Sequence, residues 1–230
     1  MDPAALLDAS SAAIVIGGTA LATLLRSGWG DCRLTFRALG RLAAGRRFDA
    51  DAVRAELAVQ IREIRQDGLV RAQAHVFGDS EFDEATGALI ETRSIEALIA
   101  RHESHKARRL AVEGAASRTL AQAAELAPVF GLAGTLISLS QLPADGIARG
   151  AFAGAISMAV LTTLYGLLLA NLVLAPLSRA LDRAMFAEEA ERQKLFDWLA
   201  QQVAPVIRQR RAGGLQGHAP ASAPGLGEAA

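Results

Sequence analysis

The sequence predicts an all-α membrane protein with three transmembrane helices and a large helical cytoplasmic region. Of its 230 residues 51% are hydrophobic, and three uncharged apolar blocks stand out at residues 9–25, 126–142 and 150–177. A helix needs about 20 apolar residues to cross a bilayer core, with about 17 as the lower limit. Charged residues lie between and after these blocks, a pattern typical of membrane spans rather than of amphipathic soluble elements.

The first predicted span occupies residues 1–25, with the N-terminus in the periplasm. Its uncharged block is bounded by Asp8 and Arg26, and Trp29 follows where an interfacial aromatic residue anchors a membrane helix. The block only just reaches the length of a span, so an interfacial or buried helix is the alternative. The acidic start, with Asp2 and Asp8, does not resemble a cleavable signal peptide.

Residues 26–125 are predicted to form a cytoplasmic helical region. This stretch opens with six basic residues against one acid, Asp31: Arg26, Arg33, Arg37, Arg41, Arg46 and Arg47. An excess of arginine beside a membrane helix marks its cytoplasmic side.

Two helices are expected within this region, separated by a looser segment at residues 78–87. Asp49 can cap the first helix, and Gly68 can end it. Its apolar residues recur at helical spacing: Val53, Leu57, Ile61 and Ile64. The second helix, residues 94–125, is rich in Ala, Arg, Glu and Leu and leads into the membrane.

Residues 126–177 are predicted to form a transmembrane hairpin, the ion-channel domain, with a short periplasmic turn at residues 143–149. Arg179 and Arg183 then mark the cytoplasm again. Residues 178–211 are predicted to form a cytoplasmic C-terminal helix with an amphipathic pattern. The Gly-, Ala-, Pro- and Ser-rich residues 212–230 are predicted to be a disordered tail.

Small and hydroxylated residues in the hairpin predict close helix packing. In lipid, packing contacts drive the association of helices, and small residues allow their backbones to approach. Gly150 and Gly154 form a GxxxG pair, for which simple dimer packing is the alternative. The predicted packing residues are Gly131, Gly134, Gly150 and Gly154.

Three threonines and two prolines are the predicted ion-pathway residues: Thr135, Thr162, Thr163, Pro128 and Pro176. Three hydroxyls on one hairpin favour a polar stripe along a water-accessible path, although any hydroxyl can instead bond its own helix backbone. A proline inside a span can kink the helix and free a carbonyl, and a plain helix-entry proline is the alternative.

None of the three blocks contains Asp, Glu, Lys, Arg or His. A proton relay in a membrane needs a titratable group within the field. If the chain conducts protons, the carboxylate must therefore come from a partner's helix. Otherwise hydroxyls and carbonyls handle a cation.

The remaining signals point away from enzyme chemistry, and we predict no catalytic residues, cofactor or metal. His102 and His105 have a spacing that can bind zinc, but a third ligand is not evident, so a solvated charged face is favoured. Gly17 and Gly18 lack the lysine of a phosphate-binding loop. Cys32 is the only cysteine and can form no intrachain disulfide, and a net charge of zero argues against nucleic-acid binding by the whole chain.

Several segments resemble the MotA/PomA stator subunits and, more distantly, TolQ and ExbB, the MotA/TolQ/ExbB proton channel family. Residues 14–25 (IVIGGTALATLL) resemble the second membrane helix of MotA-type proteins. Residues 127–142 (APVFGLAGTLISLSQL) resemble the third and residues 158–181 (MAVLTTLYGLLLANLVLAPLSRAL) the fourth. Residues 64–70 (IRQDGLV) and 95–103 (IEALIARHE) are similar to the cytoplasmic region of these proteins.

The resemblance implies a ring of such chains, expected to be pentameric, in the inner membrane around single-span partner helices. A MotB-like partner, or an ExbD/TolR-like one, supplies a membrane aspartate. Pro128 and Pro176 fall on the prolines of the family, and the three threonines fall on its pore threonines in a set closer to the sodium-driven branch. Arg65 falls on the rotor-facing arginine, whereas Gln73 stands where the family has a glutamate, which puts the usual rotor contact in doubt.

Three functions are consistent with this reading. The leading hypothesis is an ion-conducting stator subunit, for protons or sodium, that drives flagellar rotation. The alternatives are a TolQ/ExbB-type energiser of outer-membrane transport or envelope integrity, and a non-conducting membrane scaffold. The chain begins where the second helix of MotA proteins begins, which fits either a start placed too late or a true three-span layout like that of TolQ and ExbB.

Overall fold

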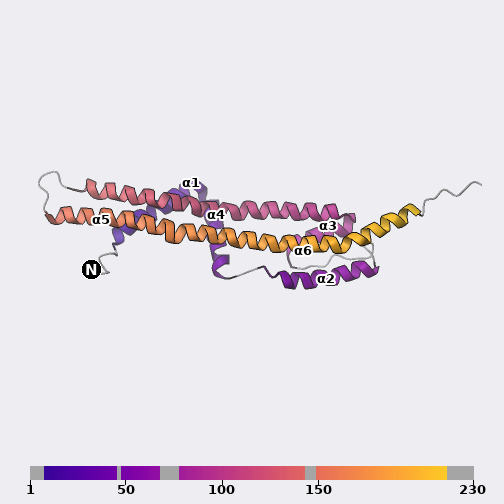
Figure 1. The fold of residues 1–230 in the computed structure, drawn as a ribbon. Coiled ribbons are helices and arrows are strands. Elements are labelled where there is room, and N and C mark those ends of the chain that lie inside the picture. The colour runs from indigo at the N-terminus through magenta and orange to yellow at the C-terminus, as the bar shows by residue number, and fades with distance from the viewer. Residues whose placement is uncertain (1–7, 46–47, 68–77, 143–148, 217–230) are drawn as a thin grey trace, which may run out of the picture. The chain divides into compact units, whose positions relative to one another are not determined.

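The structure is a computed structural model that describes residues 8–45, 48–67, 78–142 and 149–216. Within these ranges every regular element is helical, and the elements are α1 (Ala9–Ala43), α2 (Ala50–Asp67), α3 (Ser80–Thr92), α4 (Ile95–Ser140), α5 (Arg149–Leu168), the π-helix η2 (Leu169–Leu174) and α6 (Ala175–Gln216) (Figure 1). Three helical stretches are long and apolar enough to cross a membrane: Ala9–Ala43, Ile95–Ser140 and Phe152–Ile207. The predicted all-α class with three spans is confirmed.

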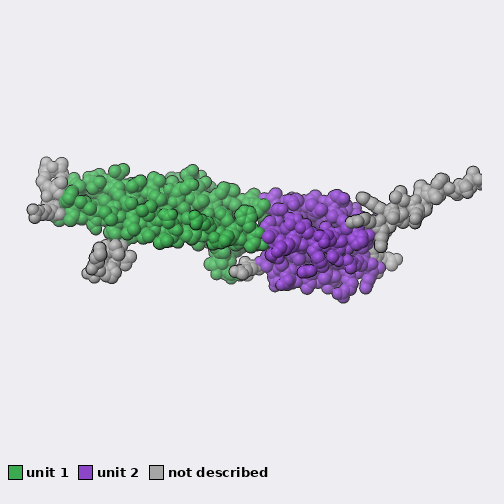
Figure 2. Space-filling view, viewed as in Figure 1, with its two compact units in different colours: residues 1–47, 108–188 green, residues 48–107, 189–230 purple. Residues whose placement is uncertain are grey.

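The chain divides into two compact units (Figure 2). Residues 1–47 and 108–188 form the first, which we call the membrane unit because it holds all three uncharged blocks. Residues 48–107 and 189–230 form the second, which we call the polar unit. Helices α4 and α6 contribute residues to both units.

Helix α1 has two sections because of a single glycine. Asp8 caps its start, where the carboxylate accepts hydrogen bonds from the backbone N–H groups of Ser10 and Ser11. Gly28 then leaves the helical conformation with φ 81° and ψ 164°, a region that favours glycine because it has no Cβ. The break separates the uncharged block from the arginine-bearing residues 29–43, in which Ala38 packs against Ala116 and Leu120 of α4.

The polar unit is built around an apolar core to which α2, α3, α4 and α6 all contribute. Helix α2 begins after Asp49, whose carboxylate accepts the N–H of Ala52 at 3.0 Å, as the sequence predicted. Gly68, the predicted end of this helix, lies outside the described residues. The buried core residues are Leu57, Ile61, Ile64, Phe82, Ala85, Leu89, Leu98, Leu195, Phe196, Leu199 and Val203.

The expectation of a looser segment at residues 78–87 is wrong, because most of it belongs to α3. Asp79 caps this helix and accepts the N–H of Glu81 at 3.0 Å. Phe82, Ala85 and Leu89 lie three and four residues apart, so they share one face and are buried in the core. Glycine inside a helix costs about 1 kcal/mol relative to alanine, and the burial of this face outweighs that cost at Gly87.

The third span continues into α6 through the π-helix η2, in which the Ala175 N–H bonds to the Ala170 carbonyl. Pro176 follows directly, lacks an N–H and crowds the carbonyl four residues earlier, which accounts for the wider turn. Helix α6 extends to Gln216, so residues 212–216 of the expected tail are helical. The remaining tail residues 217–230, and residues 143–148 of the expected hairpin turn, lie outside the described residues.

Neighbouring residues on α4 offer a matched test of the core of the polar unit. Leu98 is 0% exposed and Ile99 is 47% exposed. We expect Leu98→Ala to lower the free energy of unfolding of this unit by about 2–5 kcal/mol, because it leaves a cavity in packed surroundings. Ile99→Ala, on the solvent side of the same turn, should change it by less than about 1 kcal/mol. Urea denaturation in mild detergent, followed by the fluorescence of Trp198 in a Trp29→Phe background, measures both. Equal losses would contradict the observed core.

Candidate functional site

Helices α4 and α5 approach each other closely at three glycines, Gly131, Gly134 and Gly166. A Cβ placed on Gly166 would lie 2.7 Å from the carbonyl oxygen of Ala127 and 3.1 Å from the Cα of Gly131. A Cβ on Gly131 would lie 3.0 Å from the carbonyl oxygen of Thr162. The two helices therefore touch through their backbones, which only glycine permits here. We call Gly131, Gly134, Thr162 and Gly166 the hairpin seam.

Thr162 fills the seam beside Gly134. A Cβ on Gly134 would lie 2.7 Å from both the Cβ and the Cγ2 of Thr162, so the threonine methyl occupies the space that this glycine leaves. Thr162 is 0% exposed, and its hydroxyl donates to the carbonyl of Ala159 at 2.9 Å. The structure thus places this predicted ion-pathway residue in a packing position within the chain.

The hydroxyls of Thr135 and Thr163 also bond their own helices. Thr135 donates to the carbonyl of Leu132 at 2.6 Å, and Thr163 donates to that of Ala159 at 3.2 Å. Both residues are partly exposed within the single chain. A hydroxyl that donates its hydrogen keeps oxygen lone pairs, so each oxygen can still accept a hydrogen bond or contact a cation.

The other predicted residues divide between the seam and the chain surface. The Cα of Pro128 lies 3.2 Å from a Cβ placed on Gly166, so this proline sits at one end of the seam inside α4. Pro176 is exposed at the start of α6. A Cβ on Gly150 or Gly154 would meet no atom of the described chain within 4 Å, so this GxxxG pair takes no part in the hairpin seam.

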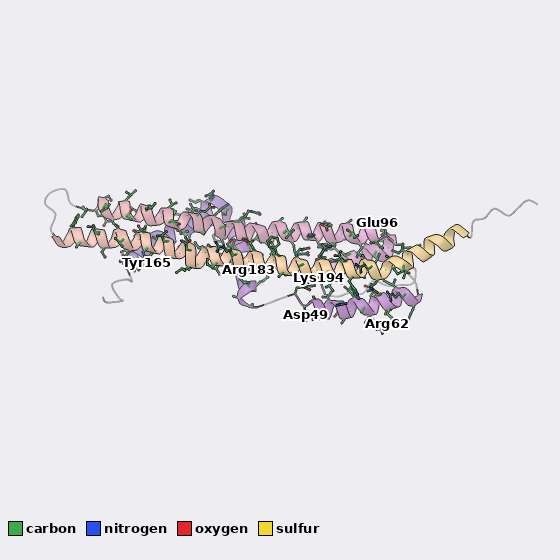
Figure 3. The ribbon with its side chains drawn as sticks, in the orientation of Figure 1. Asp49, Arg62, Glu96, Tyr165, Arg183 and Lys194 are labelled. Atoms are coloured by element: carbon green, nitrogen blue, oxygen red, sulfur yellow. The ribbon has the colours of Figure 1, made fainter. Side chains whose placement is uncertain are left out.

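Helix α1 packs against the hairpin through contacts that the sequence did not predict. A Cβ on Gly18 would lie 2.3 Å from the Cδ1 of Phe130 on α4. Near the other end of the span, the Ser27 hydroxyl donates to the Gln122 side-chain oxygen at 2.8 Å. The Asp8 N–H donates to the hydroxyl of Tyr165, labelled on α5 in Figure 3, at 3.1 Å. These contacts hold α1 against both α4 and α5.

Arg65 and the two histidines lie in the polar unit. Arg65, at the end of α2, donates to the side-chain oxygen of Gln202 on α6 and is exposed. Gln73, the position of the missing glutamate, lies outside the described residues. His102 contacts Glu81, whereas His105 contacts Glu84. In the part of the chain that the structure describes, no group of three or more metal-binding side chains is present.

Comparison with known proteins gives one family and a consistent set of relatives. The sequence profile of the MotA/TolQ/ExbB proton channel family matches residues 62–194. A motility protein A of Cereibacter sphaeroides is 26% identical over 197 residues, which cover 84% of this chain and 76% of that protein.

Two solved structures share the fold. The C. jejuni MotAB structure matches with a TM-score of 0.78 and 18% identity, covering 96% of this chain and 88% of the other. The flagellar MotAB stator complex of Bacillus subtilis matches with a TM-score of 0.73 and 18% identity, covering 94% and 89%.

Two glycines on α5 test the hairpin seam directly. Gly166→Ala should lower the thermal stability of the detergent-solubilised chain, because the new methyl group collides with the α4 backbone, and overpacking costs about 1–3 kcal/mol or more. Gly154→Ala gains the same helix propensity without a collision inside the chain. Thermal unfolding followed by circular dichroism measures both variants, and an unchanged transition for Gly166→Ala would contradict the close crossing.

Proposed function

Because the chain belongs to the MotA/TolQ/ExbB proton channel family, we propose that it is an ion-conducting stator subunit of the bacterial inner membrane that couples ion flow to flagellar rotation. The proposal draws on its similarity to a motility protein A and on the fold it shares with two MotAB structures. Its working form is a ring of these chains, pentameric by the resemblance, embedded in the bilayer around a MotB-like single-span partner. The chemistry of the chain is ion translocation without a catalytic residue or cofactor.

The observation that carries this proposal is the uncharged hairpin packed through the seam. A span without any Asp, Glu, Lys, Arg or His cannot itself take up and release a proton in the field. The hairpin instead presents hydroxyl oxygens and backbone carbonyls. The partner's membrane aspartate completes the path and carries the exchangeable charge. One charge that crosses 100 mV releases about 2.3 kcal/mol, enough to drive a conformational step.

The ion-pathway residues divide into two roles under this proposal. The oxygens of Thr135 and Thr163 have free lone pairs and contact the ion or its water on the partner-facing side. Thr162 and Pro128 fix the helix spacing at the seam, and Pro176 sets the start of α6 after the π-helix. A threonine set of this kind suits a sodium ion as well as a hydrated proton, since both bind oxygen ligands.

Arg65 is the proposed contact with the flagellar rotor. It lies on the exposed side of α2, and its guanidinium donates a hydrogen bond to Gln202 of α6. This bond restricts the orientation of the exposed guanidinium. Arg62 lies one turn earlier on α2 and is also exposed (Figure 3). A cationic surface of this kind fits an acidic partner surface.

A TolQ/ExbB-type energiser remains the second proposed function, because three apolar spans occur in the described chain, as in those proteins. Gln73 in place of the family glutamate favours it too. The non-conducting scaffold is the third, since none of the three uncharged blocks holds Asp, Glu, Lys, Arg or His. The three proposals differ in partner and in whether ions cross.

Threonine variants test conduction. Thr163→Val keeps the side-chain shape and removes the oxygen, so we expect swimming speed to fall at least tenfold, while the amount of assembled protein in the membrane stays unchanged. Thr163→Ser, which restores the oxygen, should recover motility. Thr23→Val on α1 is the matched control, because its hydroxyl is likewise bonded to its own helix, at the Thr19 carbonyl, but lies outside the proposed path.

Pro128→Ala should also reduce motility, through altered spacing of the seam. Normal swimming of both the Thr163→Val and Pro128→Ala strains would count against a stator role.

The partner can be identified by co-purification in mild detergent. We expect a single-span protein with one membrane aspartate and a peptidoglycan-binding domain, recognised by mass spectrometry. Recovery of a small ExbD/TolR-like chain instead would support the energiser, and recovery of neither from a membrane extract in which the chain is intact would support the scaffold.

A further inference from the structure

The polar unit encloses a small group of charged side chains that the ion pathway does not use. His102 of α4 is 1% exposed and Glu81 of α3 is 2% exposed. The Nδ1 of His102 lies 2.7 Å from an oxygen of Glu81, and its Nε2 lies 2.9 Å from the side-chain oxygen of Gln193 on α6. Glu189 of α6 approaches the same Nε2 at 3.9 Å. One imidazole ring therefore joins three helices.

An aromatic ring stacks on this histidine, and an arginine binds its partner Glu81. Its ring stacks on Phe196 with 4.1 Å between centroids, and Phe196 stacks on Phe82 of α3 at 4.6 Å. Arg192 of α6 donates to the second oxygen of Glu81 at 2.9 Å and pairs with Asp79 at 2.8 Å. The hydrogen bonds of His102 thus lie inside the apolar core of the unit, where a lost partner is costly.

The orientation of the Gln193 amide decides which atoms face the histidine. Its nitrogen donates to Asp197 at 3.0 Å, and its oxygen accepts the ammonium of Lys106 at 3.1 Å. The oxygen is therefore the atom that faces His102. Both ring nitrogens of His102 then face oxygen acceptors, and a neutral imidazole has only one N–H to donate. Only the doubly protonated ring satisfies both contacts.

The charges around the ring favour the same state. Glu81 and Asp79 come from the α3 end, Glu189 and Arg192 come from α6, and Lys106 lies on α4 at the rim. The group contains three carboxylates and one arginine. A protonated His102 ring therefore offsets part of the excess negative charge. His105, one turn along α4, faces Glu84 at 3.0 Å on the exposed side and does not enter the group.

We propose that His102 is a proton-operated latch: its protonated ring holds α3 and residues 189–203 of α6 against α4, and loss of the proton at alkaline pH loosens the polar unit. Loss of the proton leaves the ring with a single N–H, so it can no longer donate to both the Glu81 carboxylate and the Gln193 oxygen, and a nitrogen lone pair then faces one of these two acceptors. Because Gln202, the partner of Arg65, lies on the same part of α6, the latch also steadies the surface that carries Arg65. The latch does not depend on the proposed motor function.

The direction of the pH effect follows from the pKa of His102. Burial alone lowers this pKa, but the hydrogen bonds with Glu81 and Gln193 and the charges of Glu81 and Glu189 together raise it above the ordinary 6.5. A group whose pKa is higher in the folded state stabilises that state fully below pH 6.5. The stabilisation is lost as pH rises from 6.5 through the folded-state pKa.

The first experiment measures the pKa of His102 in the intact protein. Histidine hydrogen–deuterium exchange with mass spectrometry, on the full chain in mild detergent, gives the titration midpoint of each ring. We expect the His102 midpoint to lie above its midpoint in the same chain denatured in urea. A native midpoint at or below the denatured one would overturn the proposal, and this measurement needs no variant to fold.

The second experiment measures the helices that the latch holds. Backbone amide exchange of residues 80–92 and 189–203, corrected for the intrinsic rate, should show protection that falls with pH above 6.5 by up to about tenfold per unit. In His102→Gln, which keeps a donor but not the charge, protection should be lower and independent of pH in this window. His105→Gln, the neighbouring control, should keep the wild-type dependence.

Protection in the wild-type chain that does not change with pH would overturn the latch, as would an unchanged pH dependence in His102→Gln. Neither experiment measures swimming. Evidence against the latch therefore does not affect the proposed motor function, and a failure of the motility tests does not affect the latch.

Discussion

The membrane unit depends on one contact, the approach of the α4 and α5 backbones at Gly131, Gly134 and Gly166. In lipid, helices gain little from burying apolar surface, because the surrounding tails are equally apolar. The two helices are therefore held by close packing, which the absence of side chains at these glycines permits. Thr162 fits its methyl group into the space beside Gly134, so the hydroxyl-bearing face of the hairpin is fixed by the same contact.

The two units differ in whether their packed interiors contain charged side chains. The uncharged blocks of the membrane unit contain no Asp, Glu, Lys, Arg or His. The polar unit instead buries Glu81, His102 and Arg192 in its core, where Glu81 pairs with both of the others. Burial of a charge is expensive unless it is paired and hydrogen-bonded. A network of this kind specifies one arrangement of α3, α4 and α6 and makes that arrangement depend on one proton.

Sequence patterns located the elements better than they located the contacts. The cap at Asp49 and the spacing of Leu57, Ile61 and Ile64 correctly predicted α2. Residues 78–87, which begin and end with glycine, were wrongly predicted to be a looser segment. Most of them belong to α3, whose apolar face is recognisable only because neighbouring helices bury it. The GxxxG spacing at Gly150 and Gly154 marked a pair with no contact inside the chain, whereas Gly166 forms the seam without standing in that motif.

By itself the sequence determined the helical class, the three spans and the absence of a carboxylate from their uncharged blocks, because these follow from local composition and length. The tertiary structure decided which glycines form the seam, where α1 breaks at Gly28 and how His102 finds Glu81. Histidine and glutamate lie 21 residues apart in the chain and on different helices. Contacts of this kind depend on how helices pack in three dimensions, and no periodicity along one helix encodes the residue it meets on another.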